Sequence, residues 1–105
     1  MERLTFRFEG GRASDAASPC IVGVVASGNL EVLIEPKGQG GACVVDVNTA
    51  SHGFGSTWSA VLADFFERHR VGDVLISIND AGATPATVAL RLDQAIETFT
   101  EGGPA

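Results

Sequence analysis

Residues 20–36 read CIVGVVASGNLEVLIEP, two apolar stretches on either side of a short polar turn. Residues 20–26 form a continuous apolar run rich in β-branched residues, and in residues 30–35 every second residue is a branched apolar one, as in strands. Between the two stretches, Ser27-Gly28-Asn29 supplies Gly and Asn, which tolerate positive φ. We therefore predict a β-hairpin with Ser27 at its tip.

Further strands are expected on both sides of this hairpin. Apolar and polar residues alternate in residues 4–9 and again in residues 42–48, which is the period of a strand with one buried face. Residues 10–19 are rich in Gly, Ala and Ser without periodicity and are predicted to be a loop. We expect the four strands to form a meander.

The second half of the chain is predicted to contain two helices around a fifth strand. Ser56 or Thr57 can cap a helix that runs to about His69 and stops at Gly72. Its apolar stripe consists of Trp58, Val61, Leu62, Phe65, Phe66 and His69. A strand is expected over residues 74–79, and a second helix from Pro85, capped by Thr84, to about residue 100.

This order of elements predicts an α+β fold, since strands come mostly early and helices late. We expect a small, mainly antiparallel sheet built from hairpins and covered on one face by two helices. The 105 residues support a single domain, residues 1–105, with a flexible tail at 102–105. They are too few for a barrel of eight βα units, which needs about 250. They also leave little mass to form a pocket.

The charge balance excludes some classes of partner. Lys and Arg total 7 against 13 Asp and Glu, a net charge of −6, the wrong sign for neutralising phosphates. Neither nucleic acid nor a membrane surface is therefore expected as a partner, whereas basic patches on other proteins are compatible. The first residues contain no apolar targeting segment, so we expect a cytoplasmic protein. Cys20 and Cys43 flank aliphatic runs and are predicted to be buried free thiols.

Motifs for catalysis or metal binding are not evident in the sequence. His52 and His69 are far apart, and neither cysteine has a second ligand at zinc spacing. The glycine-rich residues 38–41 and 53–57 lack the Lys-Ser/Thr ending of a phosphate-binding loop. A Gly-x-Ser-x-Gly motif is also absent. We therefore expect no catalytic or metal-ligating residues in this chain.

Ser27 is the candidate functional residue of the sequence. A serine before glycine at a hairpin tip would expose its hydroxyl to a modifying enzyme. The same residues are also ordinary turn chemistry, so local physics leaves both interpretations open.

Three segments together resemble a known family. They are residues 25–36, the start of the helix around Trp58, and residues 80–85 leading to Leu90-Arg91-Leu92-Asp93-Gln94. In this order they are similar to the acyl carrier subunit, or delta subunit, of malonate decarboxylase, over residues 20–97. A more distant resemblance is to the acyl carrier, or gamma subunit, of citrate lyase.

The resemblance implies that Ser27 carries 2'-(5''-phosphoribosyl)-3'-dephospho-CoA, with Gly28 and Asn29 supporting the turn. It implies a transferase that installs this group, and partner subunits for acyl transfer and decarboxylation between which acetyl and malonyl travel as thioesters. Malonate would become acetate and CO2 on those partners, and the carrier itself would be non-catalytic. Family members often have Asp where this chain has Asn29.

Two alternatives remain at this point. One is the equivalent carrier of citrate lyase, although the Gly-Ala-Thr-Pro turn at residues 82–85 and Trp58 favour malonate decarboxylase. The other belongs to a different class, a small α+β regulatory domain that binds a metabolite between sheet and helices.

Overall fold

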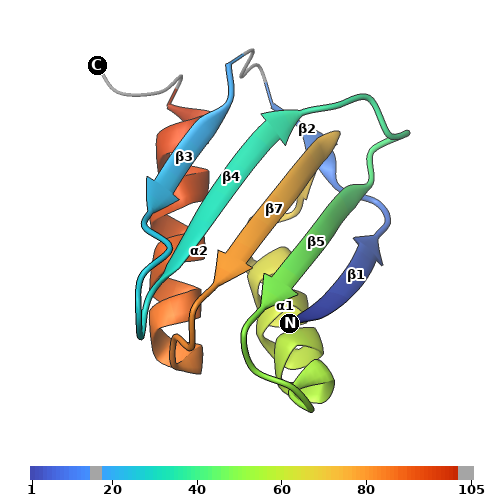
Figure 1. The fold of residues 1–105 in the computed structure, drawn as a ribbon. Helices are drawn as coiled ribbons and strands as arrows, with labels where there is room; N and C mark the ends of the chain where they lie inside the picture. Colours follow the sequence, from blue (N-terminus) through green and yellow to red (C-terminus); the bar gives the residue numbers. More distant parts are fainter. Residues whose placement is uncertain (15–17, 102–105) are drawn as a thin grey trace.

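The structure is a computed structural model that describes residues 1–14 and 18–101. Its elements are β1 (Glu2–Phe8), β2 (Arg12–Ala13), β3 (Cys20–Gly23), β4 (Leu30–Pro36), β5 (Cys43–Thr49), α1 (Gly55–His69), β6 (Val71–Gly72), β7 (Val74–Asp80) and α2 (Pro85–Thr100). Five of the strands form one sheet in the order β1-β5-β7-β4-β3, and β2 pairs with β6 in a separate two-stranded sheet. Both helices lie behind the large sheet in the view of Figure 1.

The predicted α+β class and mainly antiparallel sheet are confirmed, but the four-stranded meander is wrong. Only β5 and β7 run parallel, and the other pairs of the large sheet are antiparallel. Strand β7 lies between β4 and β5. Strands β4 and β5 are therefore not neighbours, as a meander would require. A helix between two strands is long enough to carry the chain back for parallel pairing. Here α1 connects β5 to β7 in that way, which places β7 at the centre of the sheet.

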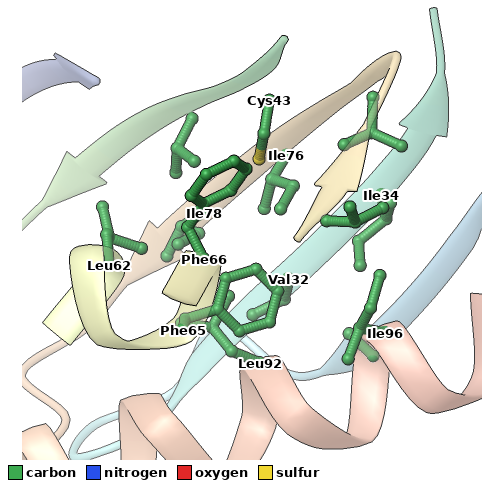
Figure 2. Close-up of a cluster of buried hydrophobic side chains, with 14 of the residues drawn as sticks. Val32, Ile34, Cys43, Leu62, Phe65, Phe66, Ile76, Ile78, Leu92 and Ile96 are labelled. Atoms are coloured by element: carbon green, nitrogen blue, oxygen red, sulfur yellow. The ribbon is translucent and has the colours of Figure 1, made fainter. Parts of the chain in front are cut away.

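One face of the sheet holds the core. In β4, β5 and β7 every second residue is buried, starting from Leu30, Cys43 and Val74, as the alternation of strand side chains requires. The stripes of α1 and α2 pack onto this face, and Figure 2 shows Phe65 and Leu92 facing the side chains of the strands. Cys20 and Cys43 are buried free thiols, as predicted.

The ends of α1 differ from the prediction. The helix begins at Gly55, with Phe54 as an N-cap residue that makes no side-chain capping bond. It ends at His69, and the C-cap residue Arg70 adopts the left-handed conformation (φ 50°) and donates its backbone N–H to the carbonyl of Phe66. Gly72 lies instead in β6, where a Cβ would overlap the carbonyl oxygen of Gly41. Close backbone packing therefore explains this glycine better than a helix stop.

Two further expectations concern segments outside the regular core. The predicted loop at residues 10–19 contains the short strand β2, which the sequence pattern did not reveal, and its residues 15–17 lie outside the described residues. The tail predicted at residues 102–105 lies outside the described residues. The second helix matches its prediction, since Thr84 Oγ1 accepts a hydrogen bond from the N–H of Thr87 and Pro85 occupies the first turn.

A cluster of charged side chains joins the two helices. Asp93 of α2 accepts a hydrogen bond from Arg68 at 2.9 Å and lies 3.0 Å from Nε2 of His69, both on α1. The His69 ring also packs on Phe65, with ring centroids 4.9 Å apart. Burial raises the pKa of the Asp93 carboxyl, but the bonds from His69 and Arg68 outweigh it, so the pKa lies below 3.8.

We expect Asp93→Asn to reduce the free energy of unfolding near pH 7 by up to about 1 kcal/mol. The effect is small because the ion pair of Asp93 with Arg68 is partly exposed to solvent. A depressed carboxyl pKa contributes stability above the unfolded pKa, and this is lost as pH falls through the folded value. The difference between wild type and variant should therefore shrink below pH 3.8. Urea unfolding at several pH values measures it. Asp64→Asn is the matched control, since Asp64 also pairs with Arg68 but is more exposed, and an equal effect there would contradict the prediction.

Candidate functional site

Ser27 lies at the tip of the connection between β3 and β4, where it is exposed. The backbone N–H of Asn29 donates to the carbonyl of Ala26 at 2.9 Å, which closes a β-turn over Ser27 and Gly28. Gly28 has φ 75°, and a positive φ at the third residue is the mark of a type II turn. A Cβ built on Gly28 would meet nothing within 4 Å, so the space beside Ser27 is open.

The first strand of this hairpin is shorter than predicted. It ends at Gly23 instead of Ala26, and Val24 and Val25 are exposed. Gly23 has φ 90° and turns the chain out of the ladder opposite Glu31. The apolar run of residues 20–26 looked like one strand because its pattern contains no polar residue to mark this break.

Replacing Gly23 with alanine should lower the free energy of unfolding by about 1–3 kcal/mol, the typical cost of a strained backbone residue. A side chain there would need an unfavourable positive φ, and its Cβ would overlap the carbonyl oxygen of Leu30. Urea unfolding measures the loss. Gly38→Ala serves as control, because nothing lies within 4 Å of its Cβ position and its φ is not positive. Equal stability of the two variants would show that Gly23 is not required.

The hairpin tip is braced by the connection between β7 and α2. The N–H of Gly28 donates to the carbonyl of Ala81, and the N–H of Ala81 donates to the carbonyl of Asn29, both at 2.9 Å. Figure 1 shows the two connections beside each other at the lower edge of the sheet. Two backbone bonds to a segment far away in sequence hold the turn in place.

Asn29 links the turn to α2 through its side chain. Its Oδ1 accepts the N–H of Leu30 at 2.8 Å and Nε of Arg91 at 3.3 Å. Arg91 also donates to Gln94 at 2.9 Å. The guanidinium group of Arg91 is thereby held at Asn29, the residue that ends the turn over Ser27 and Gly28.

Asp80, the last residue of β7, organises the neighbouring loops. It is 5% exposed, and its carboxylate accepts the Thr49 hydroxyl and the N–H of Ala83, both at 2.9 Å. Its carbonyl accepts the N–H of Ala50 at 3.0 Å. One buried residue, through its side chain and its carbonyl, thus fixes the connections that lead from β5 and β7 into the two helices.

A pocket of about 340 Å³ opens at this same edge of the sheet. Its lining comes from the starts of α1 and α2 and the loops before them: Thr49, Ser51, Phe54, Thr57, Trp58, Val61, Asp80, Gly82, Ala83, Thr84, Pro85 and Val88. The expectation that so small a chain has little mass for a pocket is therefore wrong. The crossover through α1 brings both helix starts to one edge, and the space between them is not filled.

Comparison with known proteins places the chain. The sequence model of the malonate decarboxylase delta subunit (MdcD) matches residues 17–99. The chain belongs to this delta-subunit family. The malonate decarboxylase acyl carrier protein of Stenotrophomonas maltophilia K279a is 57% identical over 105 residues, 99% of each chain. That of Burkholderia cepacia is 56% identical over 95 residues, 90% of this chain and 87% of the relative.

A solved structure shares the delta-subunit fold. A chain in the crystal structure of a Pseudomonas malonate decarboxylase hetero-tetramer in complex with malonate superposes with a TM-score of 0.84 at 38% identity, covering 94% of this chain and 99% of that one. The sequence alone left two carriers open, that of malonate decarboxylase and that of citrate lyase. The family match decides in favour of malonate decarboxylase. The chain is thus an acyl carrier subunit of that type. Within the described ranges, no helix has the length and apolar character needed to cross a membrane.

The sequence predicts the hairpin tip but not its surroundings. In the sequence, Arg91 and Asp80 are only parts of segments that match the family. Both become significant only through tertiary contacts, with Asn29 and Thr49 respectively. An aspartate that directly follows an apolar strand and precedes Gly-Ala-Thr-Pro is the one local signal that could have suggested a buried polar anchor.

Proposed function

We propose that Ser27 is the attachment point of 2'-(5''-phosphoribosyl)-3'-dephospho-CoA, and that Gly28 and Asn29 hold the turn that presents it. The observation that carries this proposal is an exposed serine on a turn braced by two backbone hydrogen bonds, in a chain of the delta-subunit family. An exposed hydroxyl is accessible to a transferase, and the bracing keeps its position constant.

The residues around Ser27 fit a phosphodiester. The open space beside Gly28 leaves room for the phosphate, and Arg91, which donates to the side chain of Asn29, supplies a positive charge at the residue that ends the turn. When bound, the group supplies a thiol at the end of a long arm, on which acetyl or malonyl is carried as a thioester. The residues of this chain anchor and position the group.

The two cysteines of the chain are poorly suited to carry the acyl group themselves. Cys43 is 0% exposed, and burial raises the pKa of its thiol to about 12. Cys20 is 6% exposed, burial raises its thiol pKa too, and its sulfur lies 3.6 Å from the carbonyl of Ala95. Because the thiolate is the reactive form, this supports a working thiol outside the polypeptide.

The partners that we propose are the acyl-transferase and decarboxylase subunits of malonate decarboxylase and the transferase that loads Ser27. The fold match to a chain of a malonate decarboxylase hetero-tetramer supports the subunit partners. The acidic chain, with net charge −6, suits docking on basic surfaces of larger proteins. A cytoplasmic location is part of the same proposal.

Mass spectrometry of the protein from its own host tests the proposal. We expect an intact mass increased by the phosphoribosyl-dephospho-CoA group, and a peptide analysis that places the increase on Ser27. Protein made without the transferase is the control and should have the unmodified mass. An unmodified Ser27 in an active complex would refute the proposal.

A further inference from the structure

We propose that the pocket between the starts of α1 and α2 binds the adenine base of the group attached to Ser27. This inference rests on the proposed function and adds a second, noncovalent contact between the chain and its group. The nucleobase would be held by the carrier, while the thiol end remains free to reach the partner subunits.

The segment that follows β7 connects the turn that bears Ser27 to the pocket. Ala81, whose carbonyl accepts the N–H of Gly28, is followed by Gly82 and Ala83, which both line the pocket. A Cβ built on Gly82 would meet nothing within 4 Å, and the same holds for Gly28. No side chain at these two positions obstructs the route from the attachment point to the pocket.

The lining suits a flat aromatic ring. Trp58 and Phe54 contribute aromatic surface, and Val61 and Val88 contribute aliphatic surface. Phe54 is 52% exposed, so much of its ring is available to a ligand. The volume of about 340 Å³ is near the lower end of the roughly 300–1,000 Å³ of small-molecule pockets. It suits a nucleobase better than the whole arm.

The polar groups of the pocket favour adenine over the malonyl end of the attached group. Asp80 is a hydrogen-bond acceptor that keeps acceptor capacity, because each of its carboxylate oxygens has two lone pairs and accepts one hydrogen bond, from Thr49 or from Ala83. The amino group of adenine is a matching donor, and the hydroxyls of Ser51 and Thr57 can donate to its ring nitrogens. A malonyl carboxylate would instead face Asp80, and like charges repel.

The covalent structure of the group allows this arrangement. Only a phosphate and two riboses separate the serine oxygen from the adenine, whereas the diphosphate and pantetheine leave the adenosine at its 5' carbon. Adenine is therefore a side branch near the anchored end. Holding it leaves the thiol-bearing part unrestrained.

The test compares the carrier with and without its group by NMR, after mass spectrometry has established modification at Ser27. We expect cross-peaks between the adenine H2 and H8 protons and the methyl groups of Ala83 and Val88, and a shifted indole N–H signal of Trp58 relative to the unmodified protein. Trp58 is the single tryptophan of the chain, so its signal is unambiguous.

Two variants sharpen this test. Ala83→Leu fills the pocket and should abolish the adenine cross-peaks, while Ala86→Leu, an exposed alanine of α2 that does not line the pocket, should retain them. If Ala83→Leu is not modified, the wild-type spectrum decides alone. Narrow adenine lines without cross-peaks, or cross-peaks from pantetheine or acyl protons in their place, would overturn the inference and leave Ser27 modification standing. An unmodified Ser27 in an active complex would overturn both.

Discussion

Replacing Ser27 with alanine should reduce malonate decarboxylation by the assembled complex to background while the carrier remains folded. The substitution removes the hydroxyl oxygen that would form the phosphodiester, and no other atom of the side chain can replace it. Because Ser27 is exposed on a turn held by backbone bonds, the free energy of unfolding should change by no more than about 0.5 kcal/mol.

The measurement combines three readouts on the same preparation: intact mass after incubation with the transferase, activity of the complex, and urea unfolding. Ser59→Ala is the matched control, since Ser59 is exposed on α1 away from the turn. It should be loaded and fully active. Activity that survives in Ser27→Ala would show that the acyl group is carried elsewhere.

Phe65→Ala is expected to have the largest effect on stability, a loss of about 3–5 kcal/mol in the free energy of unfolding. Phe65 is 1% exposed and lies between α1 and the core face of the sheet. Its removal leaves a cavity that rigid neighbours from two layers cannot close. Domains of this kind have only about 5–15 kcal/mol in total, so a substantial unfolded fraction is expected.

Urea unfolding measures this loss, and Leu90→Ala is the control. Leu90 is 52% exposed on α2, so its truncation should change stability by at most about 0.5 kcal/mol. Similar values for the two variants would contradict the packing of α1 on the sheet.

Much of the fold could be predicted because its elements have strong local periodicity. The residues on the inner face of β4 and the stripe that contains Phe65 show their period in sequence, and Thr84-Pro85 marks a helix start by local chemistry alone. The strand order could not be predicted in the same way. The pairing of β7 with β5 and β4 depends on which long connection crosses the sheet. The residues within β7 do not indicate which strands lie on either side of it.

In the candidate site, too, local features could be predicted and contacts between distant segments could not. Ser27 was located by its turn and by the family resemblance, both readable from contiguous residues. The contact of Arg91 with Asn29, the bonds of Asp80 and the pocket join segments that are distant in sequence. Periodicity predicts which side of an element is buried, but it does not predict which loops meet at the edge of a sheet.

The bracing of the hairpin tip against Ala81 also restricts the geometry of the whole enzyme. A turn fixed by two backbone hydrogen bonds cannot swing on its own. Under the proposed function, the distance that an acyl group travels would then be set by the covalent length of the arm on Ser27. If the proposed group is attached to Ser27, the partner sites that it visits in an assembled complex must lie within one arm's length of that serine, or the carrier must move between them as a rigid body.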